Sequence, residues 1–102
     1  MIRYPVFSFH GDSIFVLEAP EEVRGNLEVA AMHIPIILLD SEGQELTRVK
    51  IGRHTVELSE SGGVPDPERL RLMLRDTLRK WGQTWDDNAP LADLISATLA
   101  YS

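Results

Sequence analysis

YPVFSFHGDSIFVL, residues 4–17, contains two runs of aromatic and β-branched side chains with a short polar break between them. The runs are Tyr4 to Phe9 and Ser13 to Leu17, and the break is His10-Gly11-Asp12. Aromatic and β-branched residues favour extended strands, and a short break with glycine and aspartate favours a tight turn. This stretch therefore predicts a β-hairpin.

A short helix is expected after this hairpin. Pro20 is followed by two glutamates, which is typical of a helix start because proline fits the first turn and acidic groups favour the positive end of the helix dipole. Gly25-Asn26 is poor helix material, so the helix must be short. Residues 28–33 are interpreted as a strand, with a helix as the alternative.

The next apolar run, Ile36 to Leu39, predicts a strand that leads into a second hairpin. Asp40-Ser41-Glu42-Gly43 follows it, with aspartate first and glycine fourth, as a type I turn favours. A third hairpin is expected between residues 47 and 58, where a two-residue loop at Gly52-Arg53 sets the register.

That register determines which side chains lie on each face of the third hairpin. It places Arg48 opposite Glu57 on the solvent side, where opposite charges attract across the strands. The core face is expected to hold six side chains: Thr47, Val49, Ile51, His54, Val56 and Leu58.

Two helices are expected in the last third of the chain. Asp66 can cap a helix that begins at about Pro67, and Gly82 can end it. Apolar residues at helical spacing form one stripe in this helix and a second stripe in the last helix. The stripes are Leu70, Met73, Leu74, Leu78 and Trp81, then Leu91, Leu94, Ile95, Thr98 and Leu99.

The expected element order is therefore β-β-α-β-β-β-β-α-α. This order predicts an α+β fold in which a largely antiparallel sheet has helices packed on one face. A chain of 102 residues is the size of one domain, so residues 1–102 are expected to form a single α+β domain.

Composition narrows the classes of function. The chain has no cysteine, which excludes disulfides and thiolate metal sites, and its net charge of −6 argues against direct nucleic-acid binding. The start of the chain lacks the pattern of a signal peptide. The longest apolar run, Ile34 to Leu39, is far shorter than the ~20 residues that span a bilayer. We therefore expect no membrane partner and a cytoplasmic location.

Charge is unevenly distributed along the chain. Residues 66–82 contain five basic and three acidic side chains, whereas the segments before and after them are acidic. Arg71, Arg75 and Arg79 lie four residues apart and so share one face of the expected helix. A solvated face is the simpler interpretation of this row, and contact with an acidic partner is the alternative.

No motif indicates catalysis, a cofactor or a metal site. His10, His33 and His54 lack metal-ligand spacing, and His10 with Asp12 has no third ligand nearby. No nucleophile elbow or phosphate-binding loop occurs. The chain is therefore expected not to be an enzyme, with no catalytic, cofactor-binding or metal-binding residues.

Trp85 is the most informative residue in the polar segment between the two C-terminal helices. A tryptophan with acidic neighbours can anchor a protein interface, and the alternative is that it folds back onto the core. The candidate partner-binding residues are Trp85, Asp86, Asp87, Glu42 and Glu45.

Two stretches resemble small bacterial immunity proteins, which are encoded beside secreted toxins. They are Tyr4-Pro5-Val6-Phe7-Ser8-Phe9 with Gly11-Asp12, and the turn Leu39-Asp40-Ser41-Glu42-Gly43. The resemblance implies a stoichiometric inhibitor that blocks a cognate toxin by binding it. The leading hypothesis is thus a non-enzymatic protein-binding domain, and the alternative is a regulatory domain that binds a small ligand between sheet and helices.

Overall fold

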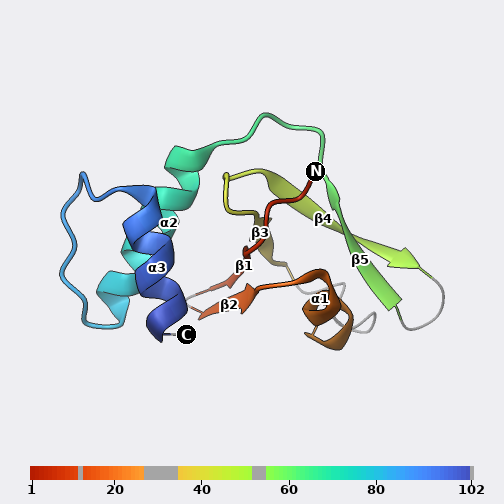
Figure 1. Cartoon of the computed structure of the whole chain (residues 1–102), viewed down its shortest axis with the longest axis horizontal. Helices are drawn as coiled ribbons and strands as arrows, with labels where there is room; N and C mark the ends of the chain where they lie inside the picture. The colour runs from red at the N-terminus through yellow and green to blue at the C-terminus, as the bar shows by residue number, and fades with distance from the viewer. Residues whose placement is uncertain (12, 27–34, 52–54, 102) are drawn as a thin grey trace.

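The computed structural model describes residues 1–11, 13–26, 35–51 and 55–101 (Figure 1). Five strands form one sheet in the order β2-β1-β3-β4-β5, and each neighbouring pair is antiparallel. The strands are β1 Val6–His10, β2 Ser13–Leu17, β3 Ile37–Leu39, β4 Glu45–Ile51 and β5 Thr55–Glu60. The helices are α1 Pro20–Asn26, α2 Pro67–Lys80 and α3 Leu91–Tyr101. The α+β class and the antiparallel sheet expected from the sequence are confirmed; the strand expected at residues 28–33 lies outside the described residues.

The first hairpin and the helix after it form where the sequence predicts them. Residues of β1 and β2 pair from Val6 with Leu17 to His10 with Ser13, which leaves two residues between the strands. The turn after β3 also forms, because the Gly43 N–H donates to the Asp40 carbonyl over 3.0 Å. Gly43 has a φ of +79°, and a Cβ there would lie 2.1 Å from the Asp66 carbonyl oxygen. Only glycine therefore lets this turn pack against the start of α2.

Side-chain alternation along β1 divides the core in two. One face packs against α2 and α3, and its cluster, the helix-side core, comprises Phe7, Phe9, Leu39, Leu70, Leu74, Leu78, Ala89 and Leu94. The other face packs against α1, and its cluster, the α1-side core, comprises Val6, Leu17, Val23, Leu38 and Leu46. The two long helices therefore share one face of the sheet, as expected, and the short α1 lies on the opposite face.

The predicted register of the third hairpin is wrong by one residue. Thr47 pairs with Ser59, Arg48 with Leu58, and Val49 with Glu57. The cause is the length of the connection, because three residues, 52–54, separate the strands where two were expected. A shift of one residue changes which side chains face each other across the pair.

The side chains expected on one core face of this hairpin consequently lie on both sides of the sheet. Val56 is fully buried and Leu58 packs against the α1-side core, whereas Val49 on β4 is 41% exposed. Arg48 points to the same side as Leu46 and Leu58, not to the solvent side that was predicted for it. His54 lies outside the described residues.

Candidate interaction surface

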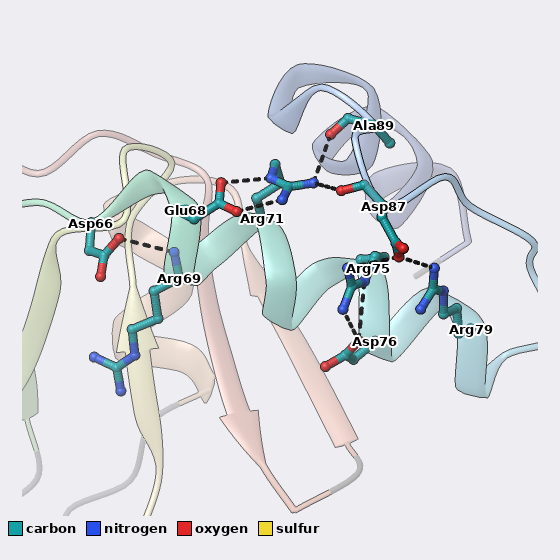
Figure 2. Close-up of polar contacts among 9 residues, drawn as sticks. All are labelled: Asp66, Glu68, Arg69, Arg71, Arg75, Asp76, Arg79, Asp87 and Ala89. Carbon is teal, nitrogen blue, oxygen red and sulfur yellow. Dashed lines mark hydrogen bonds and ion pairs between the residues drawn. The ribbon is translucent and has the colours of Figure 1, made fainter.

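Arg71, Arg75 and Arg79 form a row along one face of α2, which we call the arginine row (Figure 2). All three contact residues 81–90, the connecting segment between α2 and α3. Arg79 donates to the Trp85 carbonyl over 2.9 Å, and Arg71 donates to the carbonyls of Asp87 and Ala89. The row is thus bound along its length by the chain itself.

The carboxylate of Asp87 lies between two of these arginines. Its Oδ1 atom is 3.1 Å from Arg75 and 2.8 Å from Arg79 (Figure 2). Arg71 and Arg75 have side chains only 16% and 17% exposed. The arginine row therefore binds an acidic group of its own chain. The solvated face that the sequence favoured describes Arg79, whose side chain is 42% exposed, but not Arg71 or Arg75.

These contacts also set the path of the chain. The Arg79 to Trp85, Arg75 to Asp87 and Arg71 to Ala89 contacts show that the connecting segment runs back along α2. As a result α3 begins beside the first half of α2 and runs in the same general direction (Figure 1). Arginine donors satisfy carbonyls that the segment, lacking regular structure, leaves without backbone partners.

The ion pairs shift the pKa values of the groups involved. The hydrogen bond from Arg79, followed by the charges of Arg79 and Arg75, lowers the pKa of Asp87. The hydrogen bond from Arg71 lowers the pKa of Glu68, and the same bond raises the pKa of Arg71. Each of these shifts favours the charged form of its group.

Trp85 folds back onto the protein, which is the alternative weighed from the sequence. Its side chain is partly buried against the helix-side core, and its indole Nε1 is buried without a hydrogen-bond partner among the described residues. Its neighbour Asp86 is exposed, and the Asp86 carbonyl accepts from the Ala89 N–H over 3.1 Å. In this conformation the tryptophan serves packing more than external contact.

Glu42 and Glu45, the other two acidic candidates, are exposed near the turn between β3 and β4. Glu42 lies 3.7 Å from Arg3, and Glu45 lies 3.6 Å from Arg69 in the first turn of α2. Asp87 instead contacts Arg71, Arg75 and Arg79 further along α2. The structure therefore places the candidates in two groups, one at the first turn of α2 and one in the connecting segment beside the rest of the helix.

Asp40 is a buried carboxylate that the sequence reasoning did not treat as a special group. It is 1% exposed and accepts N–H donors of Arg3, Glu42 and Gln44 at 3.1, 2.9 and 2.9 Å. Its place at the first position of the turn was the available signal, because aspartate there commonly bonds nearby backbone. Its role is to hold the turn and the N-terminal segment together.

The described surface includes a hollow beside α1 and another over the sheet. One, of about 190 Å³, lies between α1 and β5 and is lined by Tyr4, Pro20, Val23, Val56, Glu57 and Leu58. Burial, and to a smaller extent the charge of Glu21, raises the pKa of Tyr4. The other, of about 380 Å³, is an open depression over β3 and β4. Neither is lined by residues of α2 or α3.

The remaining observations concern metals, membranes and relatives. Within the described ranges, no group of three or more histidine and acidic residues is placed to hold a metal ion. None of the helices described is both long and apolar enough to cross a bilayer. Comparison of the chain with protein-family models, curated proteins and solved structures finds no match.

Proposed function

We propose that this chain is a non-enzymatic protein-binding domain of the cytoplasm that recognises a basic protein partner. Its role, on this proposal, is that of an immunity protein, which neutralises a cognate toxin by stoichiometric binding. The observation that supports the proposal is the excess of negative charge on the exposed surface.

Exposed acidic residues greatly outnumber exposed basic residues among the positions whose exposure is described. Eleven acidic residues are exposed: Glu18, Glu21, Glu42, Glu45, Glu60, Asp66, Glu68, Asp76, Asp86, Asp87 and Asp93. Only Arg3, Arg79 and Lys80 are exposed basic residues in the same ranges. Three of these acidic residues, Glu68, Asp76 and Asp87, form ion pairs with arginines of α2, and the other eight still outnumber the exposed basic residues.

Such a surface suits a partner whose binding site is basic. A field of one sign accelerates the encounter with an oppositely charged cleft, and complementary potentials fix the orientation of the complex. Toxins that act on nucleic acids or nucleotides need basic clefts to bind phosphate, so a domain of this charge can cover such a cleft without itself binding phosphate.

The alternative function, binding of a small ligand, has one observation in its favour. The hollow between α1 and β5 is lined by apolar side chains such as Val23 and Val56 and by Tyr4 and Glu57. Its volume of about 190 Å³ is below the roughly 300–1,000 Å³ of ordinary ligand pockets, and the second hollow, of about 380 Å³, is an open depression on the sheet. The protein-binding proposal is therefore preferred.

Co-expression with the product of the neighbouring gene tests the proposal. If that product is a toxin, this chain should restore growth, and the two proteins should elute together with the mass of a one-to-one complex. The triple variant Glu42→Gln, Glu45→Gln, Asp86→Asn should protect less well, while Thr47→Ser, on an exposed uncharged side chain, should protect as the unchanged chain does. A toxic neighbour that forms no complex with this chain would refute the proposal.

A further inference from the structure

Among the described residues, β2 is an edge strand, and it lacks the charge, proline or bulge that often protects such an edge. It pairs with β1 on one side, and no strand in the described ranges pairs with its other side. Its sequence, SIFVL, contains no charged residue and no proline, and it follows β1 without a bulge in the register. Natural proteins usually place lysine, proline, a bulge or a covering segment at such an edge, because free strand edges recruit other strands.

The register shows which backbone groups face outward. Two residues separate β1 and β2, so the flanking pair, His10 and Ser13, is a hydrogen-bonded pair. Hydrogen-bonded and non-hydrogen-bonded pairs alternate, so Phe15, paired with Ser8, also directs its N–H and C=O to β1. The N–H and C=O groups of Ile14 and Val16 therefore point to the open edge.

These outward groups are symmetric about Phe15, the middle residue of β2. The Phe15 side chain is itself 49% exposed. An antiparallel copy of the same strand, related by a two-fold axis at Phe15, would place Ile14 opposite Val16 of the copy. Val16 would likewise lie opposite Ile14 of the copy. All four outward backbone groups on each strand would then be paired, giving four hydrogen bonds across the axis.

We infer that β2 is a self-association edge and that its occupant is β2 of a second copy of this chain. The two Phe15 side chains then meet across the axis as a non-hydrogen-bonded pair, with Cα atoms about 4.5 Å apart. The occupant follows from the strand itself, because its exposed Phe15 finds an apolar cross-strand partner in Phe15 of the copy. A basic protein, by contrast, gains nothing electrostatic from a strand without charged residues.

The dimer should be weak. A strand of five residues extends about 17 Å, so the pair buries much less than the roughly 800 Å² per partner of a standard interface. We expect a dissociation constant above about 10 μM, and added salt should strengthen the dimer because it screens the repulsion between acidic copies. This inference is independent of the proposed function.

Site-directed crosslinking tests the register directly, because the chain has no cysteine of its own. The Phe15→Cys variant should form a covalent dimer under mild oxidation, since a Cα separation of about 4.5 Å suits a disulfide. Val49→Cys is the matched control, because Val49 is 41% exposed on β4, away from β2. It should remain largely monomeric under the same conditions.

Sedimentation of the unchanged chain provides a second readout that needs no variant to fold. Its mean mass should rise toward that of a dimer between about 10 μM and about 1 mM, and Phe15→Asp should remain a monomer. A monomer at about 1 mM, or equal crosslinking at positions 15 and 49, would overturn the inference.

Discussion

Replacement of Asp40 by alanine should destabilise the fold strongly, although the side chain is small and lies in a turn. The carboxylate is 1% exposed and accepts three backbone N–H donors, from Arg3, Glu42 and Gln44. Alanine leaves all three donors without this acceptor. The turn also packs Gly43 against Asp66, so the loss extends to the start of α2.

The magnitude follows from the burial of each donor. The bond from the Gln44 N–H is buried, so leaving that donor unpaired costs about 1–3 kcal/mol. The donors of Arg3 and Glu42 are partly buried and can reach water after local adjustment, so each loses about 1 kcal/mol. The free energy of unfolding should therefore fall by about 3–5 kcal/mol, out of the roughly 5–15 kcal/mol that a domain of this size has.

Urea unfolding followed by tryptophan fluorescence and circular dichroism measures this change. Asp40→Asn is the matched control, because its amide oxygen can still accept from Glu42 and Gln44 while its NH₂ group cannot accept from Arg3. It should lose about 1–2 kcal/mol. An Asp40→Ala variant within about 0.5 kcal/mol of the unchanged chain, or an asparagine variant as unstable as alanine, would refute the reasoning.

Two further expectations concern the sheet and the arginine row. Val56→Asp should cost about 3–5 kcal/mol because Val56 is fully buried, whereas Val49→Asp should cost less than about 1 kcal/mol; equal losses in urea unfolding would contradict the observed register. Asp87 has a pKa below its ordinary value of 3.8 because of Arg79, so its ion pairs stabilise the fold above pH 3.8, and this contribution is lost as the pH falls through the lowered pKa. Asp87→Asn should therefore unfold more easily at pH 7 and approach the unchanged chain near pH 2; a stability difference independent of pH would speak against the ion pairs.

The elements that could be predicted from the sequence are those set by local residues. The β1–β2 hairpin follows from aromatic and β-branched runs around the break His10-Gly11-Asp12, although His10 belongs to β1, and the start of α2 follows from Asp66 and Pro67. Indeed the Asp66 carboxylate caps the helix by accepting from the Arg69 N–H over 3.1 Å. Such signals involve only a few neighbouring residues, so they can be recognised in one sequence.

The third hairpin shows where local signals fail. Thr47, Val49 and Ile51 form the more apolar alternating series of β4, so alternation alone favoured the wrong face: Val49 is 41% exposed, whereas Leu46 is buried. The choice depends on Leu46, which pairs with Leu38 of β3 and joins the α1-side core. One additional residue in the connection then changes every partner across the strands.

The candidate site was predicted only in part, for a similar reason. The spacing of the arginine row and the acidity of Asp87 were both visible in the sequence, and an acidic partner for the row was one of the alternatives. The acidic partner is Asp87 of the same chain because the connecting segment runs back along α2. No residue in that segment predicts this path. The same path carries Trp85 onto the helix-side core.

The most direct test of the central claim, that an acidic surface recognises a basic partner, is the salt dependence of the association rate. It is measured by stopped-flow fluorescence with the toxin identified by co-expression. The rate constant should fall at least about tenfold between about 50 mM and about 500 mM salt, and the triple variant Glu42→Gln, Glu45→Gln, Asp86→Asn should show a shallower dependence. A rate constant that salt leaves unchanged, in the unchanged chain and the triple variant alike, would contradict the claim.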